Sequence, residues 1–324
     1  MEGDLDKNLP KLLEWADKFD KENLYASQRK VFHDILEHPD NNWYQMIKSL
    51  WTDIDPEVRK VFFENFIVNA ALVGSSRQKK SKEEYGCNIP WAILMDPTSA
   101  CNMHCTGCWA AEYGNKLNLT FDELDSIVTQ GKELGIYFYM FTGGEPLVRK
   151  ADLIKLCEKH NECAFHSYTN GTLVDQKFCD DMKRVGNLSL SISLEGYEEV
   201  NDGRRGKGVY QKVMHAMDLL KTYGLIFGTS ICYTRANIET VTSDKFLDMI
   251  IEKGCRYAWY FHYMPVGNDA ALDLLPTKEQ REYMYHRIRE IRGLTGGKQL
   301  FAFDFQNDGE FVGGCIAGGR NYFH

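Results

Sequence analysis

The sequence contains no apolar run long enough to cross a membrane. A spanning helix needs roughly 20 mainly apolar residues, whereas the longest candidate run covers only residues 66–73. The sequence therefore excludes a transmembrane segment, although it says nothing against a peripheral contact with a membrane surface.

The chain also lacks an excess of positive charge. Its 46 acidic residues outnumber its 38 lysines and arginines, so the formal net charge is −8. Such a balance offers no broad basic surface to nucleic acid or to anionic lipid. We therefore expect no nucleic-acid partner.

A secretory signal is missing as well. The charged start of the chain, residues 1–7, has no apolar core of the kind that export requires. Nine of the ten cysteines lie between Cys87 and Cys255 at irregular spacing, unlike the regular spacing of a disulfide framework. We expect a cytoplasmic protein whose cysteines are reduced thiols.

No internal repeat or low-complexity tract is present, so apolar periodicity has to define the domains. It predicts an N-terminal helical extension over residues 1–85, of about four helices. The polar, basic residues 75–84 are expected to be a solvated linker, or else the frayed end of a helix. The extension either packs against the main domain, which is the simpler interpretation, or forms a lid or a partner surface.

Strands and helices alternate from residue 89 onward, and we assign residues 86–296 to one α/β domain. The expected strands cover residues 91–95, 136–141, 164–168, 188–194, 225–233 and 257–263. Capping boxes predict helices that begin after Thr120 and Thr277. Six such β/α units predict a mostly parallel sheet covered by helices, with the active site in the loops at the carboxyl ends of the strands.

Three cysteines follow the first predicted strand with the spacing C-x3-C-x2-C: Cys101, Cys105 and Cys108. A cubane iron–sulfur cluster needs one thiolate for each iron that the protein holds, so three thiolates leave one iron open. A structural zinc site would need a fourth ligand, yet the next cysteine is Cys157, and His104 lies too near Cys105 to share its metal easily. The loop predicts a reactive iron–sulfur cluster, with structural zinc as the weaker alternative.

This cysteine spacing resembles the signature of the radical SAM enzymes. In that family the open iron of a [4Fe–4S] cluster binds S-adenosylmethionine (SAM), and an electron from the cluster cleaves SAM to methionine and a 5′-deoxyadenosyl radical. The resemblance implies a partial (β/α)6 barrel. The sequence departs from the family at Gly107, where an aromatic residue is common. Trp109 either replaces that aromatic residue against adenine or is a buried core residue.

A second motif, Gly143-Gly144-Glu145-Pro146, follows the second predicted strand. Paired glycines let a ligand approach the backbone, and a glutamate adds a charged acceptor. A lone segment of this kind is more often a simple turn. In this position it resembles the GGEP motif of the radical SAM family, which implies that Gly143, Gly144, Glu145 and Pro146 hold the amino group of SAM.

The resemblance implies further SAM contacts at the ends of the third and fourth strands. Ser193, Glu195 and Arg205 align with residues that hold the ribose and the carboxylate of SAM, although the family commonly has aspartate where this chain has Glu195. Asn170 precedes a glycine, as an asparagine near the site does in relatives. Without the resemblance, Asn170 and the pair Arg204-Arg205 would be assigned to solvated turns.

Other polar residues gave weaker indications. His166 and His262 lie within predicted strands, so we expect satisfied core histidines rather than acid/base groups. Residues 228–233 and 263–268 resemble stretches that flank adenine and the substrate, but core strand and loop explain them equally well. The sequence identifies no catalytic residue.

The C-terminal part, residues 297–324, ends in a glycine-rich stretch that resembles the opening of a SPASM domain. In that extension, further cysteines bind auxiliary iron–sulfur clusters. No cysteine follows Cys315, so we expect a fragment of a longer SPASM protein, with auxiliary clusters only in the longer chain. The alternative is a free thiol in a loop.

Together these resemblances imply an enzyme that abstracts hydrogen from a substrate C–H bond. Its cluster must be reduced at low potential, which implies ferredoxin or flavodoxin as a partner. A peptide or protein is the first expectation for the substrate, because SPASM proteins often modify such molecules. A lipid or another small metabolite is the alternative, and a non-catalytic metal-binding scaffold is a second one.

Overall fold

One parallel sheet of eight strands forms the centre of the computed structural model, in the order β7-β6-β5-β4-β3-β2-β1-β8. The structure describes residues 5–19, 26–110, 114, 116–266, 270–313 and 317–324. The strands are β1 (Ala92–Met95), β2 (Phe138–Phe141), β3 (Ala164–Thr169), β4 (Leu188–Ser193), β5 (Phe227–Tyr233), β6 (Tyr257–His262), β7 (Phe301–Asp304) and β8 (Tyr322–Phe323). All six predicted strands are present, and the parallel α/β class is confirmed. The sequence did not predict β7 and β8, the two edge strands.

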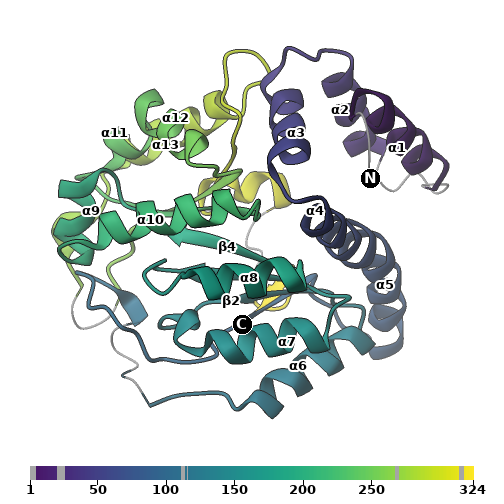
Figure 1. Cartoon of the computed structure of the whole chain (residues 1–324), viewed down its shortest axis with the longest axis horizontal. Helices are drawn as coiled ribbons and strands as arrows, with labels where there is room; N and C mark the ends of the chain where they lie inside the picture. The colour runs from purple at the N-terminus through teal and green to yellow at the C-terminus, as the bar shows by residue number, and fades with distance from the viewer. Residues whose placement is uncertain (1–4, 20–25, 111–113, 115, 267–269, 314–316) are drawn as a thin grey trace.

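Helices connect successive strands and cover the outside of the sheet (Figure 1). They are α6 (Phe121–Glu133), α7 (Lys150–Lys159), α8 (Gln176–Val185), α9 (Glu198–Arg205), α10 (Val209–Thr222), α11 (Ile238–Val241), α12 (Asp244–Glu252) and α13 (Lys278–Ile291), with 3-10 turns at Pro146–Arg149, Leu272–Leu274 and Asn307–Val312. The capping boxes predicted at Thr120 and Thr277 are both present and begin α6 and α13. None of the described helices combines the length and apolarity that crossing a bilayer would take.

The sheet curls into a half-barrel. The rings of Tyr168 on β3 and Trp259 on β6 lie 6.2 Å apart, although β4 and β5 separate these strands. In a flat sheet the two strands would be roughly 14 Å apart, at about 4.8 Å per strand. The face that carries Tyr168 and Trp259 is therefore concave, and we call it the inner face. The opposite, outer face packs on the helices: the hydroxyl groups of Tyr139 and Tyr260 donate to backbone carbonyls of α6 and α11.

The N-terminal extension is helical as predicted. Of the two interpretations of residues 75–84, the solvated linker is wrong and the end of a helix is the better one. The extension consists of α1 (Leu5–Phe19), α2 (Ala26–Leu36), α3 (Asn42–Asp53), α4 (Pro56–Phe62), a π-helix η1 (Phe63–Val73) and α5 (Gly74–Tyr85). Residues 75–84 belong to α5, because lysine, glutamate, glutamine and arginine are good helix formers. The helix ends at Gly86, which adopts the left-handed conformation with φ 65° that favours glycine at a C-cap.

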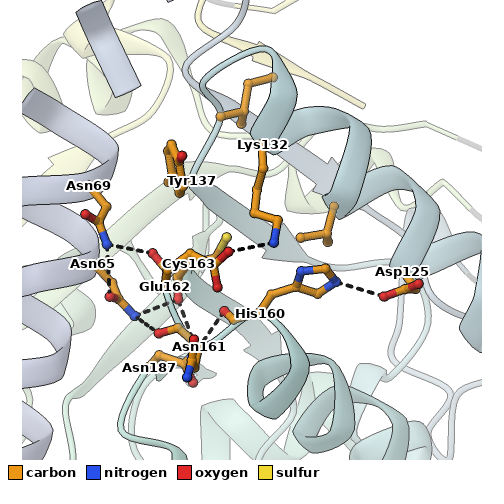
Figure 2. Close-up of polar contacts among 12 residues, drawn as sticks. Asn65, Asn69, Asp125, Lys132, Tyr137, His160, Asn161, Glu162, Cys163 and Asn187 are labelled. Atoms are coloured by element: carbon orange, nitrogen blue, oxygen red, sulfur yellow. Dashed lines mark hydrogen bonds and ion pairs between the residues drawn. The ribbon is translucent and has the colours of Figure 1, made fainter. Parts of the chain in front are cut away.

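The π-helix docks on the amino edge of the sheet (Figure 2). The amide nitrogen of Asn65 donates to the carbonyls of Asn161 and Cys163, at 2.7 and 3.0 Å, and Asn69 donates to the carbonyl of Glu162 at 2.9 Å. These carbonyls directly precede β3. The π-helix therefore packs against the end of the sheet opposite to the predicted motifs, which agrees with the simpler of the two interpretations of the extension.

Candidate functional site

The predicted motifs gather at the carboxyl edge of the sheet. The cysteine loop follows β1, the Gly-Gly-Glu-Pro segment follows β2, Asn170 follows β3 and Glu195 follows β4. Because these four strands are parallel neighbours, their carboxyl ends lie side by side. Ligands of α/β proteins bind at this edge. The order of the strands thus brings together residues that are about 100 positions apart in the chain.

None of the three motif cysteines forms a disulfide: Cys101, Cys105 and Cys108 are free thiols of intermediate exposure. The loop turns tightly, since the N–H of Cys108 donates to the carbonyl of Cys105 at 3.1 Å. Burial raises the pKa of the Cys101 and Cys105 thiols, and the positive charge of Arg205 acts in the opposite direction on both. A positive group close to these thiols stabilises the thiolates that a metal cluster requires.

No group of three or more His, Cys, Asp or Glu side chains within the described residues is arranged to hold a single metal ion. This finding counts against a zinc site in the cysteine loop, which would need four donors around one ion. It does not conflict with a cubane cluster, because each thiolate there binds a different iron. The three free thiols and the nearby arginine charge fit a cluster, and the ligand roles of Cys101, Cys105 and Cys108 stay a prediction.

Gly143 and Gly144 let the cysteine loop approach the backbone closely. A Cβ atom on Gly144 would lie 2.3 Å from the carbonyl oxygen of Ala100 and 2.5 Å from that of Ser99. A Cβ atom on Gly143, whose φ is 99°, would lie 2.7 Å from the carbonyl oxygen of Thr98. The N–H of Gly144 also donates to this Thr98 oxygen, at 3.0 Å. The approach of a ligand is therefore not the only reason for two glycines here, because the backbone of the cysteine loop already packs against both of them.

Glu145 is fully buried and joins two of the loops. Its carboxylate accepts hydrogen bonds from the hydroxyl of Thr169 at 2.7 Å, from the N–H of Asn170 at 2.7 Å and from the N–H of Leu147 at 2.9 Å. Burial raises the pKa of this carboxyl, whereas the Asn170 N–H lowers it. Pro146 begins the short 3-10 helix that follows. The side chain of Glu145 thus fixes the loop after β2 to the loop after β3.

Asn170 links the third loop to the cysteine loop. Its amide nitrogen donates to the side-chain oxygen of Asn102 at 2.8 Å, and the amide nitrogen of Asn102 donates to the hydroxyl of Thr172 at 2.9 Å. Asn102 directly follows the first motif cysteine. Asn170 is therefore placed at the predicted site, in contact with the loop that carries the thiols.

Glu195 lies between two arginines. Its oxygen Oε1 accepts from Nη1 of Arg204 at 2.7 Å and from Nη2 and Nε of Arg205 at 2.6 and 3.0 Å. Its other oxygen, Oε2, is buried and has no hydrogen-bond partner. A buried acceptor without a partner is costly, and a hydroxyl group from a bound ligand would satisfy it. This free oxygen fits the predicted ribose contact, which stays a prediction, as do the contacts of Ser193 and Arg205.

Sequence reasoning missed the role of Arg204. The alternative of a solvated turn for Arg204 and Arg205 is wrong, since both lie in the last turn of α9 with side chains that are 14% and 11% exposed. Burial alone would lower the pKa of Arg204, but the charge of Glu195 together with smaller contributions from Cys232, Cys105 and Cys108 raises it above its ordinary value. The carbonyl of Arg204 also accepts from the N–H of Thr106 at 2.9 Å. Arg204 therefore connects the Glu195 carboxylate to the cysteine loop.

Tyr263 belongs to the stretch 263–268 that resembles the flank of adenine and the substrate, but its contact with the cysteine loop was not predicted. A Cβ atom on Gly107, whose φ is 65°, would lie 2.5 Å from the Tyr263 hydroxyl oxygen. The buried ring of Tyr263 thus packs directly on the cysteine loop, and its hydroxyl accepts from the N–H of Ala271 at 2.9 Å. Trp109 is 42% exposed, so the interpretation of Trp109 as a buried core residue is wrong. Residues 267–268, also part of a predicted stretch, lie outside the described residues, as does Cys315.

Of the two strand histidines, His166 is the satisfied core residue that we expected and His262 is not. His166 is buried on the inner face between the hydroxyl groups of Ser189 and Ser191, at 2.9 and 3.0 Å from its two ring nitrogens. Burial lowers the pKa of His166 to about 3. His262 is only half-buried, and its Nδ1 has no hydrogen-bond partner, so it is not the fully satisfied core histidine that we expected.

Comparisons with known proteins agree with this arrangement. Residues 95–250 match the family model described as Radical SAM superfamily. The chain is 24% identical over 232 residues to Fe-coproporphyrin III synthase of Methanosarcina barkeri, which covers 68% of this chain and 57% of that protein. It is 27% identical over 222 residues to the mycofactocin maturase MftC of Mycolicibacterium smegmatis, which covers 66% and 56%.

A solved structure shows the same fold. The crystal structure of SuiB of Streptococcus suis bound to S-adenosylmethionine matches with a TM-score of 0.58 at 15% sequence identity, over 84% of this chain and 61% of that chain. The chain therefore spans less than two thirds of the length of these three proteins.

Proposed function

Because residues 95–250 place this chain in the radical SAM superfamily, we propose that it is an enzyme that cleaves SAM reductively and abstracts hydrogen from a substrate C–H bond. The observation that carries the proposal is the free three-thiol loop, held against the backbone of Gly143-Gly144 on one side and against Arg204 on the other. A [4Fe–4S] cluster, when bound, supplies the electron for the cleavage.

The proposal assigns the cluster ligands, the SAM contacts and one positioning residue to particular side chains. Cys101, Cys105 and Cys108 would hold the cluster. The Gly143–Pro146 segment and Asn170 would face the methionine part of SAM, and Ser193, Glu195 and Arg205 would face its ribose and carboxylate. Arg204 acts as a positioning residue, since it fixes both Glu195 and the cysteine loop. The two arginines offset the negative charge that the thiolates bring to the site.

We propose a peptide or protein as the substrate and ferredoxin or flavodoxin as the electron donor. Relatives with peptide-directed names support the substrate class: the mycofactocin maturase MftC, and the PqqA peptide cyclase of Granulibacter bethesdensis, which is 27% identical over 225 residues. A small metabolite is the second candidate. Fe-coproporphyrin III synthase favours it, and so does the AdoMet-dependent heme synthase of Methanosarcina barkeri, which is 25% identical over 214 residues.

Anaerobic reconstitution tests the proposal. The protein is loaded with iron and sulfide, reduced with dithionite and given SAM, and 5′-deoxyadenosine is measured by mass spectrometry. We expect 5′-deoxyadenosine from the wild-type protein and from Cys87→Ala, which removes an exposed thiol outside the site. We expect none from Cys105→Ala, because two protein ligands should not retain the cluster. Cleavage by Cys105→Ala, or no cleavage by a cluster-loaded wild type, would contradict the proposal and favour a non-catalytic scaffold.

A further inference from the structure

Glu195 is held through its main chain as well as through its side chain. It lies in the loop between β4 and α9. Its N–H donates to the side-chain oxygen of Asn201 at 3.1 Å, and its carbonyl accepts from the amide nitrogen of Asn237 at 3.0 Å. Both asparagines are buried. Two side-chain amides therefore fix the two polar groups of the Glu195 backbone.

One face of helix α9 is directed at Glu195. Residues three and four positions apart lie on the same face of a helix, and Asn201, Arg204 and Arg205 have this spacing. Asn201 accepts from the Glu195 N–H, whereas the two arginines donate to the carboxylate oxygen Oε1. The helix therefore contacts the backbone and the side chain of Glu195 at the same time.

Asn237 contacts Glu195 from the loop after β5, where it is the N-cap residue of α11. Its amide nitrogen also donates to the carbonyl of Cys232 at 3.1 Å, and its amide oxygen accepts from the N–H of Thr234 at 2.6 Å. Both N–H groups and the oxygen of this amide are thus used, which fixes its orientation. Asn237 therefore joins the loop of Glu195 to β5, the strand that pairs with β4.

These contacts leave one polar atom of Glu195 without a partner among the described residues, the buried carboxylate oxygen Oε2. A buried acceptor in a fixed position discriminates between a ligand with a hydroxyl group at that point and a ligand without one, because the second leaves it unpaired. A carboxylate that could turn would discriminate less, since it could find another donor. The fixed backbone of Glu195 thus favours selectivity for a hydroxyl group.

We propose that Asn201 and Asn237 are positioning residues that fix Glu195 for recognition of the ribose hydroxyl groups of SAM. This inference rests on the proposed function, and it assigns the selectivity of the ribose contact to two residues that bind Glu195 rather than SAM. Without either asparagine, the backbone at Glu195 loses a hydrogen bond and Oε2 is no longer held in one place. The loss affects the hydroxyl groups and not the rest of SAM.

Calorimetric titration of the reconstituted protein without reductant tests the inference, since SAM is not cleaved without an electron. The probes are SAM and its 2′,3′-dideoxy analogue, which lacks both ribose hydroxyl groups. We expect the wild type to bind SAM about 10- to 100-fold more tightly than the analogue, as for a hydrogen bond to a charged group. We expect Asn201→Ala and Asn237→Ala each to reduce this preference by about three- to tenfold.

Aspartate variants separate positioning from a general loss of structure. Asn201→Asp keeps an oxygen that accepts from the Glu195 N–H, so it should retain the preference. Asn237→Asp lacks the N–H groups that the carbonyls of Glu195 and Cys232 require, so it should lower the preference as Asn237→Ala does. The preference is a ratio of two affinities of the same protein, and a partly unfolded sample does not change it.

Asn187→Ala is the matched control. Asn187 is also fully buried and also donates to main-chain carbonyls, those of Cys157 and Cys163 at 3.1 and 3.0 Å, but at the amino edge of the sheet (Figure 2). The inference is overturned if the wild type binds both probes equally, if both alanine variants in the Glu195 contacts keep the wild-type preference, or if Asn187→Ala lowers it as much as they do. SAM cleavage is measured separately, so its absence in the cluster-loaded wild type would contradict the proposed function alone.

Discussion

Replacing Gly144 with alanine should displace the cysteine loop. The added Cβ atom would lie 2.3 Å from the Ala100 carbonyl oxygen, and real Cβ atoms essentially never come within 3.0 Å of such an atom. The two segments would have to separate by at least about 0.7 Å. All three obstructing atoms, one on Ser99 and two on Ala100, belong to the backbone, so no side chain can rotate away. Forced overpacking of this kind costs about 1–3 kcal/mol, and here it acts directly beside Cys101.

Two measurements check this prediction. Urea unfolding of the apoprotein should show a loss of about 1–3 kcal/mol, and iron analysis after reconstitution should fall clearly below the roughly four irons per chain of a full cluster. Gly203→Ala is the matched control. A Cβ atom on Gly203 meets nothing within 4 Å, and alanine in helix α9 should stabilise the protein by about 0.5–1 kcal/mol. If Gly144→Ala matched the wild type in both stability and iron content, the close approach would not be what fixes the loop.

Three further predictions follow from buried polar groups. Glu195→Gln should lower the free energy of unfolding by about 3–5 kcal/mol, because it leaves the buried Arg204 and Arg205 without a counter-charge; an unchanged urea midpoint would refute this. Asn65→Ala should cost about 1–3 kcal/mol, because it removes two hydrogen bonds, to the carbonyls of Asn161 and Cys163, that contribute about 0.5–1.5 kcal/mol each, and a value near zero would contradict the docking role of the π-helix. The pKa of His166 is about 3 in the folded protein and near 6.5 in the unfolded chain, so its contribution to stability is complete above pH 6.5 and declines as the pH falls. Between pH 7 and pH 5 the wild type should lose about 2 kcal/mol more than His166→Gln, and equal losses in urea titrations would refute the assignment.

Local sequence signals predicted most of the sheet. The strands from β1 to β6 have apolar cores, and several of the helices begin at unmistakable caps such as Thr120 and Thr277. The edge strands β7 and β8 were not predicted. β8 has only two residues, too few to show a periodic pattern, and β7, although as long as β1 and β2, lies in residues 297–324, which we assigned to a separate C-terminal part. Their place in the sheet depends on pairing with distant strands.

The parts of the site that could be predicted are those whose residues lie within one short motif. The three cysteines and the Gly-Gly-Glu-Pro segment each carry their own signal. The contact between Gly107 and Tyr263 joins residues about 150 positions apart, and no local pattern around either residue predicts that they touch. The alternative of a solvated turn for the two arginines was wrong for a related reason. Arg204 and Arg205 stand beside glycines and so resemble a turn, but both donate hydrogen bonds to the buried carboxylate of Glu195.

The asparagines of the π-helix contact only main-chain oxygens of the loop before β3, and this has an evolutionary consequence. Asn65 and Asn69 depend on the path of that loop and not on the side chains that it bears. Position 161 is therefore free to drift among homologues without weakening the attachment, whereas the two asparagines are not. An alignment of close homologues should therefore show asparagine retained at positions 65 and 69 and different residues at position 161.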